Sequence, residues 1–317
     1  MNEVVTIGDV LITFNPRSKG PMKFVNTFER KIGGAELNFA IGCARLGLKT
    51  GWISRLGNDE FGQYALNVIR GEGIDTSQVK LVDGFATSLY FKEVLEDGSG
   101  RSFYYRTNSP TDTLTEETID ENYIRNTKVL HITGVFLAVN KEKNIPLILK
   151  ALQIAKKNKV LISFDPNIRL RLWKRDEVQS ALLQILPYVD ILLTSIEEAE
   201  ILFGTINTKE IIKKSTQLGV TYIAIKQGDA GSIGYFHGEL IDAPPVKAKL
   251  VVDTVGAGDG FDAGFIYGIL NNWSLERTLL FANTIGSIVV GVIGDNEGLP
   301  YFDDVLIRMG EKEFIDR

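Results

Sequence analysis

The sequence has little of the chemistry that builds cross-links or metal–thiolate centres. Cys43 is the only cysteine among 317 residues, so a disulfide within the chain and a cluster of cysteine ligands are both excluded. Cys43 lies among small residues in GCARLG, and we expect a buried, unreactive thiol on a helix. The two histidines, His131 and His237, lie in no motif, and we expect both to be structural.

Long hydrophobic segments and an excess of positive charge are also absent. The longest apolar stretch, residues 285–294, is too short to cross a bilayer, and the N-terminus has no secretory-signal pattern. The 35 basic and 40 acidic residues give a net charge of -5, and the sequence contains no block of lysine or arginine. We therefore expect a cytoplasmic protein that binds neither nucleic acid nor a membrane.

Apolar segments rich in valine and isoleucine alternate with amphipathic helical patterns along the chain. The predicted strands are 4–12, 129–133, 160–165, 190–194 and 222–226. This alternation predicts an α/β fold whose mostly parallel sheet is covered by helices on both faces. No linker-like or repetitive tract divides the chain, so we expect a single domain over residues 1–317.

Residues 86–107 break this alternation. Two β-prone segments flank Asp97-Gly98-Ser99-Gly100, which is typical of an antiparallel hairpin. Residues 13–32 have a weaker strand pattern and are expected to add strands to the same unit. An inserted hairpin of this kind predicts a small β-sheet lid over a site at the edge of the main sheet.

Residues 253–265, DTVGAGDGFDAGF, contain four glycines where a helical pattern begins. A glycine turn before a helix offers backbone N–H groups and the positive end of the helix dipole to an anion. Asp259 follows in the first turn, where a carboxylate can cap the helix or accept a proton from an attacking hydroxyl. The glycines favour the second role, because a cap does not require them. No Gly-Lys-Ser/Thr follows, so this is not a Walker loop, and we predict phosphoryl transfer.

The same segment, intact from Asp253 to Phe265, resembles the C-terminal signature of the PfkB, or ribokinase-like, family of carbohydrate kinases. Residues 31–47, KIGGAELNFAIGCARLG, are similar to the first signature of that family. Read physically, the glycines at 33 and 34 admit a ligand close to the backbone, and Asn38 offers a donor and an acceptor to sugar hydroxyls. A helix cap followed by a surface asparagine fits this second segment equally well. The resemblance implies a ribokinase-like three-layer sandwich with a mostly parallel central sheet and a small β-sheet lid.

The resemblance also implies roles for individual residues. Asp259 is the expected base, and the N–H groups of Gly256, Ala257 and Gly258 are the expected anion hole. Asp253 is expected to orient substrate or to hold the loop near a monovalent cation, which leaves K⁺ open as an activator. The residues expected to contact substrate are Gly33, Gly34, Asn38, Tyr90, Tyr104, Arg106, Arg169, Asp253 and Asp259.

KQGDAGS, residues 226–232, and the pair Ala282-Asn283 are similar to nucleotide-binding segments of the family. The residues expected to contact ATP are Ser195, Lys226, Gly228, Gly231, Gly256, Gly258 and Asn283. Two simpler interpretations stay open, because QGDAG is also an ordinary turn and Asn283 also fits a helix surface. The family's Asn-x-x-Glu motif reads Ser195-Ile196-Glu197-Glu198 here. Glu198 therefore keeps the carboxylate expected to place hydrated Mg²⁺ near ATP, whereas the asparagine contact is lost.

The end of the hairpin, SFYYRTNSP, bears on the substrate. Alternate residues of a strand share a face, so Tyr104 and Arg106 point the same way, and Tyr90 of the opposite strand joins them. Arginine binds a carboxylate through two parallel hydrogen bonds, which favours a sugar acid. Arg169, after another strand, is a second candidate. The lid segment is similar to that of the 2-keto-3-deoxygluconate kinases of the family. The alternative is an exposed Arg106 paired with a lid glutamate such as Glu93.

We therefore expect ATP-dependent, Mg²⁺-assisted phosphorylation of the 6-hydroxyl of 2-keto-3-deoxygluconate by a homo-oligomer that associates through its lid. Alternatives are a fructokinase or another neutral-sugar kinase, which would not depend on Arg106, and a nucleoside kinase. The intact Asp259 argues against a non-catalytic sugar-binding protein. A nicotinamide-dependent oxidoreductase would need a glycine fingerprint after the first strand, which is missing. Asp295 is left outside the site, because the residues after it read as an ordinary turn.

Overall fold

Nine strands form the central sheet of the computed structural model, which describes residues 1–97 and 99–313. Their order is β13-β12-β11-β10-β9-β8-β1-β4-β5. Every pairing from β11 to β5 is parallel, and the β11–β12 and β12–β13 pairings are antiparallel. The strands are β1 Val4–Ile7, β4 Thr50–Gly57, β5 Val79–Val82, β8 Val129–Thr133, β9 Leu161–Asp165, β10 Ile191–Ser195, β11 Tyr222–Lys226, β12 Ser232–Phe236 and β13 Glu239–Ala243. The mostly parallel sheet is thus confirmed.

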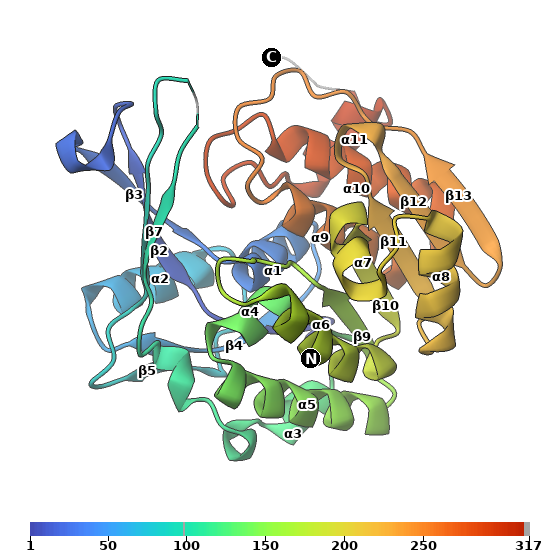
Figure 1. Cartoon of the computed structure of the whole chain (residues 1–317), viewed down its shortest axis with the longest axis horizontal. Coiled ribbons are helices and arrows are strands. Elements are labelled where there is room, and N and C mark those ends of the chain that lie inside the picture. Colours follow the sequence, from blue (N-terminus) through green and yellow to red (C-terminus); the bar gives the residue numbers. More distant parts are fainter. Residues whose placement is uncertain (98, 314–317) are drawn as a thin grey trace.

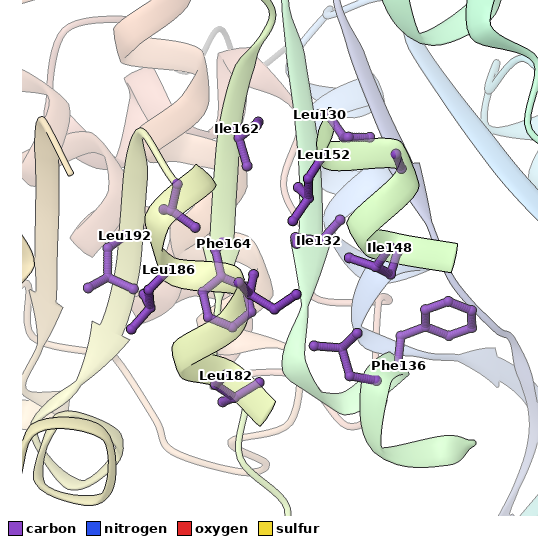
Figure 2. Close-up of a cluster of buried hydrophobic side chains, with 14 of the residues drawn as sticks. Leu130, Ile132, Phe136, Ile148, Leu152, Ile162, Phe164, Leu182, Leu186 and Leu192 are labelled. Carbon is purple, nitrogen blue, oxygen red and sulfur yellow. The ribbon is translucent and has the colours of Figure 1, made fainter. Parts of the chain in front are cut away.

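Alternate strand residues supply two separate hydrophobic cores, one on each face of the sheet. Leu192 of β10 packs in one core, whereas its neighbours Ile191 and Leu193 pack in the other. Figure 2 shows part of the first core, where strand residues such as Phe164 face helix residues such as Leu152. Two buried faces require helices on both sides, so the valine- and isoleucine-rich strands dictate the three layers.

The helices divide between these faces. On the first face lie α4 Gly134–Val139, α5 Lys141–Lys157, α6 Arg175–Ile185, α7 Ile196–Phe203 and α8 Thr208–Gln217, with α3 Glu121–Arg125 beside α5. On the second face lie α1 Ala35–Arg45, α2 Glu60–Gly71, α9 Ala257–Leu270, α10 Leu275–Val289 and α11 Phe302–Met309. Short 3₁₀ turns occur at Met22–Phe24, Pro110–Thr113, Glu116–Thr118, Leu186–Tyr188 and Gly228–Ala230. No helix of the described residues is long and apolar enough to span a membrane.

A separate four-stranded sheet forms the lid, in the order β3-β2-β6-β7. Its strands are β2 Leu11–Pro16, β3 Phe28–Gly33, β6 Leu89–Lys92 and β7 Ser102–Tyr105. Figure 1 shows this sheet at the opposite side of the molecule from β12 and β13. The predicted hairpin is present, although Gly98 of its turn lies outside the described residues. Because β3 and β7 are edge strands, association through the lid stays a prediction.

One sequence-based expectation about the strands is wrong. The predicted strand 4–12 is two strands: β1 ends at Ile7 in the main sheet, and β2 begins at Leu11 in the lid. The chain therefore crosses between the sheets at residues 8–10. The segment that leads into Asp253 is irregular, and residues 250–252 are exposed. Hydrogen bonds from the N–H groups of Val252 and Asp253 to the carbonyl of Val290 hold this segment in place.

The residues expected to be structural behave as such. Cys43 is fully buried on α1, and burial raises the pKa of its thiol, so it is unreactive. His131 lies in β8, stacks on Phe39 and contacts the hydroxyl of Ser163 through Nδ1 at 3.0 Å. Burial lowers the pKa of His131 to about 3, so the ring is neutral. His237 lies in the turn between β12 and β13.

Candidate active site

Polar side chains gather where parallel strands of the main sheet end. Asp9 follows β1, Asp165 ends β9, Ser195 ends β10 and Lys226 ends β11. The carboxyl ends of these strands lie on one edge of the sheet, which is where α/β proteins bind their ligands. The N-terminus of α9 reaches the same place, because Lys226 lies against Gly258 and Asp262 of that helix.

The glycine turn before α9 has the geometry of an anion-binding turn. Gly256 is the N-cap residue with φ 79°, in the left-handed region that favours glycine. A side chain at this position would overlap the carbonyl oxygen of Asp295. α9 begins at Ala257, so the N–H groups of its first turn have no partner inside the helix. The N–H of Ala257 makes only a long 3.4 Å bond to Thr254, which leaves donors for an anion.

Asp259 is the third residue of α9, and its carboxylate is 8% exposed. It does not cap the helix, so the simpler of the two interpretations of this residue is wrong. Its Oδ2 accepts a 2.8 Å hydrogen bond from Nδ2 of Asn38 on α1. Burial raises the pKa of Asp259 to about 6, and the bond from Asn38 opposes that rise. Asp259 is therefore ionised at neutral pH and poised to accept a proton.

Asn38 is buried, so it is not the surface asparagine of the alternative interpretation. Its amide nitrogen, expected to serve sugar hydroxyls, instead holds Asp259 in position. Its Oδ1 is buried with no hydrogen-bond partner among the described residues and stays available as an acceptor.

Lys226 forms a buried ion-pair cluster rather than pointing freely to solvent. Its Nζ lies 3.1 Å from Oδ1 of Asp262 on α9 and 3.3 Å from Oδ1 of Asp165 on β9. These carboxylates raise the pKa of Lys226 against the opposing effect of burial, so it stays charged. The Nζ atom also lies 3.8 Å from the position of a Cβ added to Gly258. A fixed positive charge therefore stands beside the glycine turn.

Ser195 and Glu198 bind each other in a capping box at the start of α7. The N–H of Ser195 donates to Glu198 Oε2 at 2.9 Å, and the N–H of Glu198 donates to Ser195 Oγ at 3.2 Å. The other carboxylate oxygen of Glu198 accepts the N–H of Ile168. Burial, and then the charge of Asp165, raise the pKa of Glu198. Both oxygens thus have structural partners, and no cluster of three or more metal-ligating side chains is found among the described residues.

The other residues of the predicted nucleotide segment lie around the ends of β11 and β13. Gly228 and Gly231 form the turn between β11 and β12. Asn283 on α10 donates to the carbonyl oxygens of Ala243, at 3.4 Å, and Pro244, at 3.1 Å, and so anchors the loop after β13. A cleft of about 440 Å³ lies near the segment before Asp253, lined by Lys249, Leu250, Ser287, Ile288, Gly291, Val292, Asp304, Ile307 and Arg308.

The lid presents aromatic and basic side chains on one face. Tyr90 and Tyr104 are directly opposite each other on β6 and β7, and their rings stack with centroids 5.1 Å apart. Tyr90 is buried, and its hydroxyl accepts a hydrogen bond from Ser102. Lys92, two residues after Tyr90, reaches across to Asp253 with an Nζ–Oδ2 distance of 2.6 Å. Asp253 is therefore part of a contact between the lid and the segment that leads into the glycine turn.

Arg106 is anchored by Asp9, at the point where the chain crosses between the sheets. Its Nε lies 3.0 Å from Oδ2 of Asp9, which is buried. The hydroxyls of Ser88 and Ser109 donate to the same oxygen. The proposed pairing of Arg106 with Glu93 is wrong, because Glu93 pairs with Arg101 and accepts the N–H of Met22. Asp9 lies inside the predicted strand 4–12, and a charged residue in that apolar segment was the signal that sequence reasoning missed.

Asp295, which sequence reasoning left outside the site, lies inside it. A side chain at Gly33 would overlap Oδ2 of Asp295, and Gly34 adopts φ 134° beside the carbonyl of Asp9. The glycine pair at the start of α1 therefore admits the Asp295 carboxylate. Burial raises the pKa of Asp295 to about 7, and the charge of Lys92 opposes this rise.

Two further charged residues complete the site. Glu36 is buried, accepts a hydrogen bond from Thr133 and has its pKa raised by burial to about 7. The charge of Arg106 lowers this pKa, whereas the charge of Asp259 raises it. Arg169 lies on the exposed loop after β9, and its charge lowers the pKa of Asp259.

Comparison with known proteins agrees with this architecture. The chain is 35% identical over 309 residues to the 2-dehydro-3-deoxygluconokinase of Bacillus subtilis, which covers 94% of this chain and 92% of that one. It is 32% identical over 323 residues to the 5-dehydro-2-deoxygluconokinase of Clostridium perfringens, covering 99% and 93% of the two chains. The structure of a putative ribokinase II from E. coli, in complex with ATP and Mg²⁺, superposes with a TM-score of 0.91 at 26% identity, covering 98% of this chain and 100% of that one. Residues 1–301 match the family described as pfkB family carbohydrate kinase. The protein is a member of the pfkB family of carbohydrate kinases.

Proposed function

We propose that the protein transfers the γ-phosphoryl group of ATP to the 6-hydroxyl of 2-keto-3-deoxygluconate. The observation that carries the proposal is Asp259, a buried carboxylate that directly follows the glycine turn at the N-terminus of α9. It lies where an attacking hydroxyl and a transferring phosphate would meet.

In this reaction the Asp259 carboxylate takes the proton of the 6-hydroxyl as that oxygen attacks the γ-phosphorus, and ADP leaves with the electron pair of the broken P–O bond. The N–H groups of Gly256, Ala257 and Gly258 receive the charge of the transferring phosphoryl group. Closure of the lid over the sugar excludes water from the site.

The lid supports a sugar acid as substrate. Arg106 uses only its Nε on Asp9 among the described residues, so both terminal nitrogens remain for a carboxylate. The stacked pair Tyr90 and Tyr104 provides an adjacent apolar face and two hydroxyls. Arg169 and the Oδ1 of Asn38 are further contacts that we assign to substrate. The B. subtilis relative is named for the same substrate.

ATP fits the other side of Asp259. We assign its phosphates to the glycine turn, Lys226 and the Gly228–Gly231 turn, with Ser195 at the adjacent strand end. We place the base near Asn283, in the apolar cleft beside Leu250 and Ile288. Since both oxygens of Glu198 accept backbone N–H groups, the residues present fit a Mg²⁺ ion held mainly by the ATP phosphates, with Glu198 reached through water. When bound, this ion neutralises charge on the phosphates.

The C. perfringens relative supports a second candidate, 5-dehydro-2-deoxygluconate. This compound is also a six-carbon sugar acid, and the two candidates differ in the positions of the keto and deoxy carbons. Arg106 would read the carboxylate of either one, so the lid does not separate them.

The test is ADP release with Mg²⁺ and ATP from a panel of the two sugar acids, fructose, ribose and adenosine. We expect turnover of 2-keto-3-deoxygluconate and at least a tenfold lower kcat/KM for it in Arg106→Ala, since a charge-assisted pair contributes about 1.5–3 kcal/mol. Preference for 5-dehydro-2-deoxygluconate would select the second candidate. Turnover of fructose that is insensitive to Arg106→Ala would overturn the sugar-acid assignment.

A further inference from the structure

One contact that the reaction above does not use joins the lid to the glycine turn. Lys92 lies on β6 on the same face as Tyr90, and its Nζ is 2.6 Å from Oδ2 of Asp253, which is 161 residues away in sequence. The two side chains are 22% and 11% exposed, so the pair is largely removed from solvent. Lys92 belongs to the lid sheet, whereas Asp253 lies three residues before Gly256, the N-cap of α9.

Asp253 transmits this contact to the backbone of the turn. Its second oxygen, Oδ1, accepts the N–H of Val255 at 3.3 Å, and Val255 is bonded directly to Gly256. The carboxylate thus bridges the ammonium group of Lys92 and the residue next to the N-cap of α9. The N–H groups of Val252 and Asp253 also donate to the carbonyl of Val290, and the N–H of Ala257 donates to that of Thr254. The ion pair of Lys92 with Asp253 therefore connects the lid to the glycine turn.

The charge of Lys92 also faces an excess of negative groups. Asp253 and Asp295 both lie near it, and its charge counteracts the burial-driven rise in the pKa of Asp295. An incoming phosphate would be repelled by these carboxylates if no cation stood between them. The Asp253 carboxylate accepts hydrogen bonds from the ammonium group of Lys92 and from the N–H of Val255.

We propose that Lys92 is a positioning residue for phosphoryl transfer: by binding Asp253 it couples closure of the lid to the position of the anion-binding turn, and it neutralises carboxylates beside the phosphate. The proposal rests on the proposed kinase function. It predicts that closure of the lid over bound sugar fixes the position of the glycine turn that we assign to the ATP phosphates.

A second lid lysine provides a matched control. Lys31 on β3 also contacts the loop after α10. Its Nζ lies 3.5 Å from Oε1 of Glu297 and donates to the carbonyl of Ile293 at 3.1 Å. It joins the lid to a neighbouring loop but makes no hydrogen bond or ion pair with residues 253–259, all of which the structure describes. Comparing Lys92→Met with Lys31→Met separates a specific action on the turn from general docking of the lid.

The experiment measures steady-state kinetics and amide hydrogen exchange for both variants. In Lys92→Met we expect kcat to fall about tenfold with less than a threefold change in the KM for sugar, because a transition-state contact is disturbed while sugar contacts remain. We expect faster exchange at residues 255–258 in the same variant. Lys31→Met should keep kcat within twofold and leave that exchange unchanged. Methylammonium or ethylammonium added to Lys92→Ala should restore part of kcat.

The outcomes are distinct. Equal losses in the two methionine variants, or an unchanged kcat and exchange rate in Lys92→Met, would overturn the proposal while leaving the kinase assignment intact. Wild-type protein that turns over no sugar would instead remove the proposed function, and the exchange measurement would still decide whether Lys92 orders the turn. If Lys92→Met fails to fold, Lys92→Arg is measured in its place. This variant keeps the charge and should retain most of kcat.

Discussion

The site contains two mostly buried cations, Arg106 from the lid and Lys226 from the main sheet, and they are held differently. Arg106 is bound by one carboxylate, Asp9, through a single nitrogen. Lys226 is enclosed by two carboxylates, Asp165 and Asp262, and lies near Glu198. Both cations are mostly buried, with side chains 10% and 16% exposed.

The difference indicates what each cation is for. A guanidinium held by one nitrogen keeps a planar pair of donors for a ligand, so Arg106 is suited to selecting a substrate. An ammonium group among several carboxylates has its charge largely offset, so Lys226 is suited to fixing the strand ends and α9 beside the phosphates. We therefore assign substrate selection to the lid and phosphate binding to the edge of the main sheet.

The largest effect is expected from removing the candidate base, Asp259. Asp259→Asn should lower kcat about 10³-fold, within the range of 10²–10⁴-fold typical of general-base catalysis. Sugar binding measured by calorimetry should persist, because the amide keeps the shape of the carboxylate. The exposed Asp176→Asn on α6 serves as control. Retained turnover in Asp259→Asn would show that another group takes the proton.

The next test measures how much Lys226 contributes to the stability of the fold. Lys226→Met should lower the free energy of unfolding by about 3 kcal/mol, since it leaves two carboxylates buried without a partner. Adding Asp262→Asn should recover part of that loss, because one of the unpaired charges is removed. Denaturant unfolding of the single and double variants measures both values. Equal stabilities of the two variants would mean that Asp262 is not held by Lys226.

A milder change sharpens the assignment of Arg106. Arg106→Lys keeps the charge beside Asp9 but loses the two-donor fork, so kcat/KM for the sugar acid should fall about tenfold, or 1.4 kcal/mol. The kcat/KM for any neutral sugar that is turned over should stay within twofold. The ratio of the two rates is the measurement, and an unchanged ratio would argue that Arg106 does not read the carboxylate.

The smallest effect concerns pH. Asp259 must be ionised to act as base, so kcat/KM should decline as the pH falls through about 6, the raised pKa of this residue. The hydrogen bond from Asn38 lowers that pKa, so Asn38→Ala should move the midpoint to higher pH. A pH profile of both proteins checks the direction. A midpoint that stays in place would indicate that Asn38 only fills space.

Local patterns in the sequence predicted the elements that local physics determines. The glycine turn, Asp259, the parallel strands and the lid hairpin each depend on neighbouring residues and were found. Three partners were not found: Asp9 for Arg106, Lys92 for Asp253, and Asp262 for Lys226. Each pair joins residues at least 36 positions apart, so only the tertiary fold brings them together.

The break in the first predicted strand has a similar cause. Gly8 and Asp9 interrupt the apolar pattern too briefly to signal a change of sheet, because Val10 and Leu11 continue it. The structure shows why both are there: a side chain at Gly8 would overlap Glu36, and Asp9 anchors Arg106.

This crossing has a consequence for engineering. The first connection from the main sheet to the lid spans only three residues, 8–10, and the middle one is the anchor of the lid arginine. A lid transplanted from another kinase would therefore have to bring its own junction, since a foreign hinge would misplace the anchor together with the strands. A transplant that changes substrate preference should therefore replace the lid strands together with residues 8–10. Point substitutions within the lid are the more conservative route to a new sugar.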